Sequence, residues 1–219
     1  YGYPVRRHIR KIQKSKARAK FGFNQYAPLL LVMGGSQGAV SLNEWARSHF
    51  TSLAESGIHL CCLTGLNKGN AGVLEHTNSK GNLIRAHFIP FCDDMSELLS
   101  ASDLVVARSG AGSIAEVSRC QLPSILVPLP NSADNHQCAN AVYHERRGCC
   151  VIVPQKEMDR LEREVKYLID NESLLDSMRT NLKRLDLDDS LELIVEDLEL
   201  LFREGDPTRS FQLKAKEAM

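Results

Sequence analysis

The segment with the clearest potential for chemistry is Ser109-Gly110-Ala111-Gly112-Ser113-Ile114-Ala115-Glu116, which follows the apolar run 104–107. This order predicts a buried strand, a turn of small residues, and a helix that begins near Gly112 or Ser113. Small residues let a ligand approach the backbone, and the first turn of a helix has unpaired N–H groups. Glu116 falls about one turn into this helix, so its carboxylate can accept hydrogen bonds from a ribose diol. An ordinary strand–helix turn with a solvated Glu is the alternative.

A second small-residue turn, Gly34-Gly35-Ser36-Gln37-Gly38, lies between the apolar run 29–33 and a predicted helix over 39–56. Strand, glycine-rich turn and helix form a phosphate-binding arrangement, because backbone N–H groups and the helix dipole face the anion. Ser36 adds a hydroxyl. The turn is not a Walker A motif, since no Gly-Lys-Ser/Thr follows it. The next predicted strand, 58–63, ends in Thr64-Gly65 without an acid, which disfavours NAD.

The composition of the 219 residues is that of a globular chain with ample apolar material for a core. Hydrophobic residues make up 43% and charged residues 25%. Lys+Arg and Asp+Glu both number 27, so the overall charge does not indicate nucleic acid or an acidic ligand. No apolar run is long enough to span a membrane, and no signal-peptide pattern is present. The seven Cys form no CxxC pair or zinc spacing, which predicts reduced, cytosolic thiols and no bound metal.

The basic residues are concentrated at the start of the chain. Residues 1–20 contain eight Lys/Arg and no acid. We expect a basic junction segment here, extended over its first residues and then an exposed helix or arm over 7–20. A solvated face is the favoured interpretation, with a phosphate or membrane surface as the alternative. A nucleic-acid-binding role for this segment is the least favoured, because it leaves the glycine-rich turns unexplained.

The elements that must position these turns alternate between strands and helices. Further strands are predicted over 83–89, 104–107, 124–127 and 149–153, with a short helical stretch before the first of them. Helices are predicted over 95–100, 138–147, 156–169, 174–185 and 190–202, the last with a wide apolar stripe that requires a partner. This order predicts an α/β fold, a doubly wound parallel sheet of the Rossmann-like type with a helical C-terminal segment. The predicted domain covers 21–204, and 205–219 is expected to be a flexible tail.

Four motifs occur in an order that resembles the C-terminal, donor-binding domain of the MurG glycosyltransferases, across about residues 4 to 200. They begin at Gly34, Phe91, Arg108 and Asp134, and read Gly-Gly-Ser-Gln-Gly-Ala, Phe-Cys-Asp-Asp-Met, Arg-Ser-Gly-Ala-Gly-Ser-Ile-Ala-Glu and Asp-Asn-His-Gln-Cys-Ala-Asn-Ala. The segment Tyr3-Pro4-Val5-Arg6 is similar to the Asn-Pro-Val-Arg of the family's interdomain junction. The resemblance implies the C-terminal half of a GT-B glycosyltransferase.

The resemblance also implies a donor site. Arg6 and Ser36 would meet the diphosphate, the backbone at Cys92 would read the uracil edge, and Glu116 would hold the ribose hydroxyls. The nucleotide would be lined by Ala111, Gly112, Ser113, Ile114 and Ala115. His136 and Gln137 would contact the sugar. Cys92 replaces the usual Ile, Ser113 stands where Thr is common, and His136 stands where some members have Gln. The family requires no metal or other cofactor in this site.

The implied reaction is inverting transfer of N-acetylglucosamine from UDP-N-acetylglucosamine to the lipid-linked muramyl-pentapeptide, lipid I to lipid II, in peptidoglycan synthesis. This would place the protein in the cytoplasm, peripheral on the inner face of the membrane, with roles in cell wall biogenesis, cell division and cell shape. Inverting transfer needs a general base. None is identified in this sequence, so the base and the acceptor groove are expected from an N-terminal Rossmann domain in cis or in trans. The alternatives are a non-catalytic nucleotide-sugar-binding module and a subunit of a split glycosyltransferase.

Overall fold

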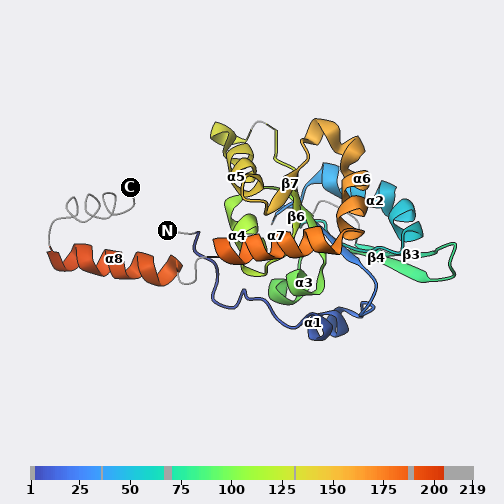
Figure 1. Ribbon diagram of the computed structural model, residues 1–219, viewed down its shortest axis with the longest axis horizontal. Coiled ribbons are helices and arrows are strands. Elements are labelled where there is room, and N and C mark those ends of the chain that lie inside the picture. The colour runs from blue at the N-terminus through green and yellow to red at the C-terminus, as the bar shows by residue number, and fades with distance from the viewer. Residues whose placement is uncertain (1–2, 36, 67–70, 131, 187–189, 205–219) are drawn as a thin grey trace.

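The computed structural model describes residues 3–35, 37–66, 71–130, 132–186 and 190–204. These residues form a seven-stranded sheet, which lies between helices (Figure 1). The strand order is β3-β4-β2-β1-β5-β6-β7, and every pair is parallel except β3 with β4. The order reverses at β1, which lies between β2 and β5. The strands are β1 Leu29–Met33, β2 His59–Leu63, β3 Gly72–Thr77, β4 Leu83–Ile89, β5 Leu104–Ala107, β6 Ser124–Leu126 and β7 Cys150–Ile152.

Helices cover both faces of this sheet, as predicted for a doubly wound fold. The helices are α1 Lys14–Phe21, α2 Val40–Glu55, α3 Met95–Ala101, α4 Ala111–Arg119, α5 His136–Glu145, α6 Leu161–Ile169, α7 Glu172–Leu185 and α8 Ser190–Glu204, with short 3-10 turns η1 Ala133–Asn135 and η2 Gln155–Arg160. Residues of α2, α6 and α7 form one core with alternate strand residues such as Leu30 and Val32. Residues of α1, α3, α4 and α5 form the other core with Leu31 and Met33. Because both faces are covered, the central strands are apolar throughout.

The segment before β4 differs from the prediction of a short helical stretch. It forms the edge strand β3, which pairs antiparallel with β4 from Gly72↔Phe88 to Thr77↔Leu83. The turn between them is closed by Asn78, whose Oδ1 accepts hydrogen bonds from the N–H groups of Lys80 and Asn82 at 3.1 and 2.9 Å. Side-chain acceptors of this kind stabilise turns in place of a helix. The helical prediction is therefore wrong.

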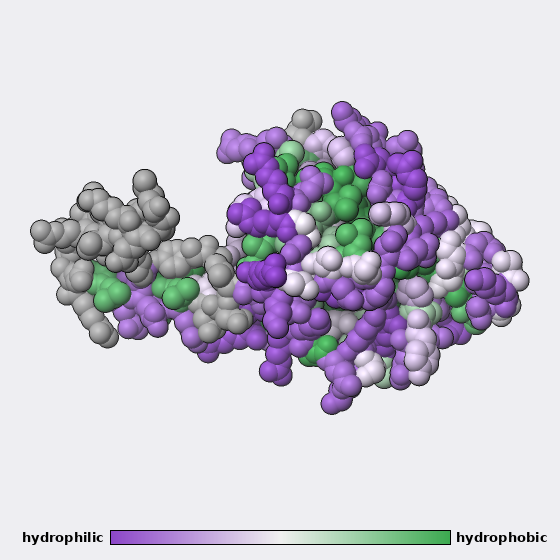
Figure 2. All heavy atoms as spheres, viewed as in Figure 1, coloured by the Kyte–Doolittle hydropathy of each residue, from purple (hydrophilic) through white to green (hydrophobic). Residues whose placement is uncertain are grey.

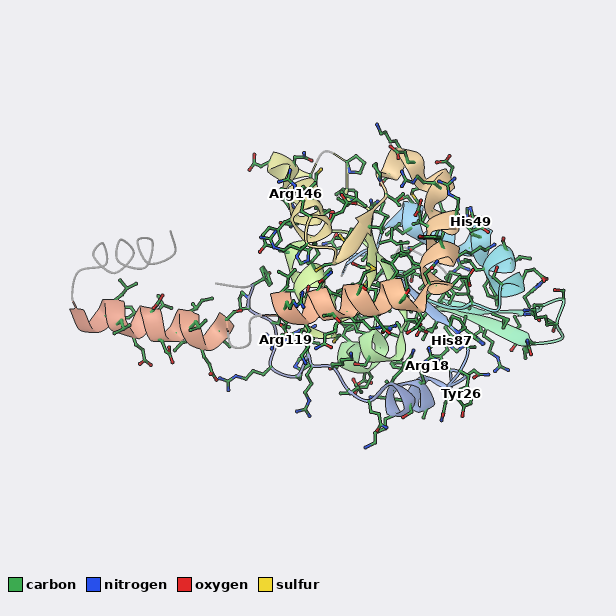
Figure 3. All side chains as sticks on the ribbon, viewed as in Figure 1. Arg18, Tyr26, His49, His87, Arg119 and Arg146 are labelled. Atoms are coloured by element: carbon green, nitrogen blue, oxygen red, sulfur yellow. The ribbon has the colours of Figure 1, made fainter. Side chains whose placement is uncertain are left out.

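The basic segment is also more buried than predicted. The helix α1 packs on α3, and the side chain of Arg18 is 1% exposed between them (Figure 3). Its guanidinium donates to the carbonyls of Asn24, Gln25, Ala27 and Ala101 and to the carboxylate of Asp103. A buried cation needs such partners, because desolvation without them is costly. The prediction of an exposed arm fails at Arg18, which is part of the fold.

The last described helix, α8, extends away from the sheet (Figure 1). Its apolar side chains are exposed, and Figure 2 shows apolar surface along it. They are Leu191, Leu193, Val195, Leu198, Leu200 and Phe202, from 40% to 86% exposed. Four residues of the predicted stripe are therefore exposed, and its other two, Ile194 and Leu201, are half-buried. The predicted tail over 205–219 lies outside the described residues. None of the described helices combines the length and the apolar character needed to cross a membrane.

Candidate functional site

Two glycines bring the turn after β1 against the turn after β2. Gly38 has φ of +68°, and a Cβ placed on it would lie 2.0 Å from the carbonyl oxygen of Thr64. Gly65 has φ of +83°, and its Cβ would lie 2.5 Å from the backbone nitrogen of Gly38. Both positions need a residue that has no side chain and tolerates positive φ. Asn43 of α2 fixes the same contact, because its Nδ2 donates to the carbonyl of Thr64 at 2.9 Å.

The helices α2 and α4 begin at the carboxyl ends of β1 and β5, the two strands between which the sheet order reverses. Neither has a side-chain cap, and neither has an acid in its first turn. The first N–H groups of each helix and the positive end of its dipole therefore have no carboxylate in the helix's own first turn to compensate them. The helix α4 begins at Ala111, one or two residues before the predicted start. These two ends form the kind of surface that binds an anion.

A pocket of about 310 Å³ lies at this edge of the sheet, and we call it the switch-point pocket. It collects residues from the arm, from the ends of β1 and β2, from the segment after β4, and from α4. They are Arg6, Met33, Gly35, Leu63, Pro90, Phe91, Cys92, Met95, Gly112, Ser113 and Glu116. Open α/β sheets bind ligands in the crevice outside the strand ends where the order reverses, which is the position of this pocket.

Within the switch-point pocket, Arg6 contacts Glu116 directly. Nη2 of Arg6 donates to Oε1 of Glu116 at 2.9 Å, and the side chains are 57% and 20% exposed. The carboxylate thus lies in the pocket that also contains Gly35, so a hydrogen-bond acceptor lies beside the first glycine-rich turn. The two residues are 110 positions apart in the sequence, and in the fold their opposite charges compensate each other.

The wall opposite these charges is apolar. It is formed by the last side chains of two strands, Met33 and Leu63, together with Phe91 and Met95. Sequence reasoning assigned Met33 and Leu63 to buried strands and did not include them in the site. The sequence signal that could have assigned them to the site is that each is the final residue of its strand. Cys92 completes this wall, and burial raises the pKa of its thiol, so the thiol is neutral near physiological pH.

The predicted nucleotide-lining residues of α4 fall on two sides of the helix. Gly112 and Ser113 line the switch-point pocket together with Glu116. Ala111, Ile114 and Ala115 line a second pocket of about 300 Å³, which also contains Tyr3, Val5, Asn140 and His144. Ile114 is 6% exposed and packs in the core. The structure therefore does not bring all five residues to one surface.

The remaining predicted residues lie apart from the switch-point pocket or outside the description. Ser36 is not among the described residues. His136 is exposed at the first position of α5. Gln137 follows it, and its Oε1 accepts a hydrogen bond from the N–H of Leu129 at 3.0 Å. Both residues are in the first turn of α5, which follows the loop after β6 at the same carboxyl edge of the sheet. Neither lines the switch-point pocket.

The chemistry available at this edge is the binding of an anion with an apolar, planar group attached. N–H groups and Arg6 can face phosphate oxygens, the apolar wall can hold a base, and Glu116 can accept from hydroxyls. Within the described residues, no group of three or more His, Cys, Asp or Glu side chains is arranged to hold a metal ion. The fold and the pocket are those of the Rossmann-like class of nucleotide-binding α/β domains.

The comparison with known proteins identifies the family within that class. The model of the glycosyltransferase family 28 C-terminal domain matches residues 29–194, and the chain belongs to this family. The crystal structure of Acinetobacter baumannii MurG has the same fold. Its TM-score is 0.66 at 20% sequence identity, and the match covers 89% of this chain and 56% of that one. The predicted fold, the C-terminal half of a GT-B glycosyltransferase, is confirmed.

Two curated relatives carry the name UDP-N-acetylglucosamine--N-acetylmuramyl-(pentapeptide) pyrophosphoryl-undecaprenol N-acetylglucosamine transferase. That of Opitutus terrae is 48% identical over 202 residues, which are 92% of this chain and 54% of the relative. That of Parasynechococcus marenigrum is 38% identical over 210 residues, which are 91% of this chain and 56% of the relative. The chain thus spans about half the length of the curated relatives that it matches.

Proposed function

We propose that this chain is the donor-binding part of an inverting glycosyltransferase that uses UDP-N-acetylglucosamine. The observation that carries the proposal is the pocket that Glu116 and Gly35 both line, because a carboxylate that can accept from ribose hydroxyls there would lie beside a turn and helix end suited to a diphosphate. The names of the Opitutus and Parasynechococcus relatives support the identity of the donor. They also support the lipid-linked muramyl-pentapeptide as the acceptor.

In this proposal six of the predicted residues have a role toward the donor. Glu116 accepts from the two ribose hydroxyls, and the backbone at Cys92 meets the uracil edge beside the wall of Met33 and Leu63. Arg6 and Ser36 hold the diphosphate over the N-terminal ends of α2 and α4. His136 and Gln137 lie at the start of α5, where they can reach the sugar from the loop after β6.

The chain's contribution to catalysis is stabilisation of the leaving group. As the acceptor oxygen bonds to C1 of the sugar, the bond from C1 to the β-phosphate oxygen breaks and UDP leaves with additional negative charge. N–H groups and a guanidinium fixed near that oxygen stabilise the charge, and donors of this kind contribute several kcal/mol in comparable sites. The proton of the acceptor hydroxyl goes to a base on the second domain. No metal ion is needed for these roles, because helix ends and Arg6 supply the positive charge.

The reaction proposed here would take place in the cytoplasm, at the inner face of the membrane where the lipid-linked acceptor is held. Its product would serve peptidoglycan synthesis and thereby cell wall biogenesis, cell division and cell shape. The partner in cis or in trans would be an N-terminal Rossmann domain. The exposed apolar side chains of α8 suit a contact with such a domain. We propose no nucleic-acid partner.

The test is a binding measurement followed by reconstitution. Calorimetry of the 219-residue chain should detect UDP and UDP-N-acetylglucosamine but not CDP. Failure to bind UDP would overturn the proposal. The N-terminal part of the Opitutus terrae relative is then added in trans with a lipid-linked muramyl-pentapeptide. Transfer of N-acetylglucosamine indicates a donor-binding enzyme part or a split-transferase subunit. Tight UDP binding with no transfer favours the alternative, a non-catalytic nucleotide-sugar-binding module.

A further inference from the structure

Arg108 is a buried arginine whose hydrogen-bond partners are all neutral. It directly follows β5 and is 7% exposed. Its Nη1 donates to the carbonyls of Val127 and Pro128 at 3.0 and 3.2 Å. Its Nη2 donates to Oγ of Ser41 at 2.9 Å and to Oε1 of Gln155 at 2.6 Å. One side chain therefore links the end of β6, the first turn of α2 and the start of η2.

In the part of the chain that the structure describes, no carboxylate balances this charge. Among the residues that the structure describes, none lies within 4.0 Å of the Arg108 guanidinium, and its buried Nε has no partner. Arginine stays protonated in proteins, and buried charges are ordinarily paired. Arg18 shows the ordinary arrangement, because its equally buried guanidinium contacts the carboxylate of Asp103. Burial alone acts on the pKa of Arg108 and lowers it.

The Arg108 guanidinium contacts Ser41 in the first turn of α2, and the N-terminal end of this helix is part of the proposed phosphate site. The N–H of Arg108 donates to the carbonyl of Met33 at 3.3 Å, so its backbone is held at the end of β1, and the side chain of Met33 lines the switch-point pocket. The three helices that follow β1, β5 and β6, namely α2, α4 and α5, have no acid in their first turns. By contrast α3, α6, α7 and α8 each have at least one. Because α3 follows β4 and begins at this same carboxyl edge, the positive potential is concentrated at the part of the edge next to β1, β5 and β6.

We infer that Arg108 is a positioning residue that supplies a fixed counter-charge for the diphosphate of the bound nucleotide. This inference rests on the proposed function. The bound diphosphate provides the negative charge that the protein itself does not supply near Arg108. Arg108 then has two effects on the diphosphate. Its hydrogen bonds hold the ends of α2 and β6 in place, and its positive charge attracts the phosphate oxygens. The energetic cost of leaving the guanidinium unpaired in the free protein is offset when the nucleotide binds.

The test neutralises Arg108 without removing it. Gln155→Glu keeps the shape of the side chain and the hydrogen bond to Nη2, and adds the missing carboxylate. We expect UDP affinity to fall about tenfold and uridine affinity to stay within about twofold, because uridine has no phosphate. The thermal unfolding temperature should stay the same or rise, since the buried charge gains a partner. Gln25→Glu, an exposed position before β1, is the matched control and should change neither affinity.

A merely structural role predicts another pattern. Gln155→Glu would then leave the ratio of UDP to uridine affinity unchanged, and this result would overturn the inference. Arg108→Gln removes the charge and should lower the ratio as Gln155→Glu does, whereas Arg108→Lys should retain it. If Arg108→Gln does not fold, the Gln155→Glu ratio still decides the matter. A wild-type chain that does not bind UDP overturns the proposed function itself, which distinguishes the two failures.

Discussion

Arg6 and Glu116 form an ion pair at the mouth of the switch-point pocket, with 2.9 Å between Nη2 and Oε1. The pair joins the N-terminal arm to α4. Because the Arg6 side chain is 57% exposed, water screens the interaction, and pairs of this kind contribute about 0–1 kcal/mol. Ribose hydroxyls can therefore replace Arg6 on the carboxylate at low cost. Arg6 is then free to turn toward the diphosphate, so the ion pair is compatible with both proposed roles.

Replacement of Glu116 tests the ribose contact. Glu116→Ala removes two charge-assisted hydrogen bonds and should weaken UDP binding about tenfold to a hundredfold. Glu116→Gln keeps an acceptor without the charge and should lose less. Calorimetry with UDP measures both. Glu75→Ala, an exposed carboxylate on β3, is the control and should bind as the wild type does. An unchanged affinity in Glu116→Ala would remove this carboxylate from the site.

Replacement of Arg6 distinguishes two roles of its guanidinium. If Arg6 moves to the diphosphate, Arg6→Met should lower UDP affinity about tenfold and leave uridine affinity within about twofold. If it only orients Glu116, both ligands should lose affinity by the same factor, and the diphosphate role would be abandoned. Competition calorimetry gives both values. Arg7→Met is a close control, because Arg7 is 81% exposed and does not line the pocket.

The parts of the fold that sequence predicts well are those with local signals. The apolar run of β1 and the glycines after it define a buried strand and a turn, and Glu116 follows from its distance to β5. Gly38 and Gly65 show why the local signal is reliable, since each is required by a close backbone contact. The turns that contain Gly38 and Gly65 come together because the strands before them, β1 and β2, are parallel neighbours in the sheet.

The features that sequence reasoning missed depend on distant partners. Arg18 looks like one cation in a basic run until Asp103, 85 residues away, is placed beside it. The edge strand β3 is largely exposed along its length, so it has no alternation of buried and exposed residues, and its identity follows from pairing with β4. The role of Arg108 also depends on distant residues, because its hydrogen-bond partners come from three separate elements. Non-local contacts of this kind decide conformation where local preference is weak.

Asp103 tests how strongly the arm is held to the domain. Its carboxylate accepts from Arg18 and Lys14 and from the N–H of Leu29. Asp103→Asn leaves the buried guanidinium without a counter-charge and should lower the free energy of unfolding by about 3–5 kcal/mol. Urea denaturation measures the change. Asp159→Asn, an exposed site, should have little effect. A loss below about 1 kcal/mol in Asp103→Asn would mean that the carbonyl acceptors alone satisfy Arg18.

Three buried or half-buried histidines predict how stability depends on pH. Burial lowers the pKa of His59, His87 and His144, so each stays neutral in the folded protein at a pH where the unfolded chain is already protonated. The unfolded state then binds more protons, and stability must fall as the pH drops below about 6.5, the ordinary pKa of histidine. Above that pH neither state is protonated and the effect disappears.

His59 is the best residue for measuring this effect, because its partner can be kept. Its Nδ1 accepts from the N–H of Arg85 at 3.1 Å, and the Oδ1 of Asn can accept the same bond. His59→Asn should therefore reduce the loss of unfolding free energy between pH 7.5 and pH 5.5 by about 1 kcal/mol. Urea denaturation at both pH values gives the difference. His8→Asn, at an exposed site, should leave the loss unchanged. Equal losses in the wild type and His59→Asn would show that the imidazole of His59 is protonated without unfolding.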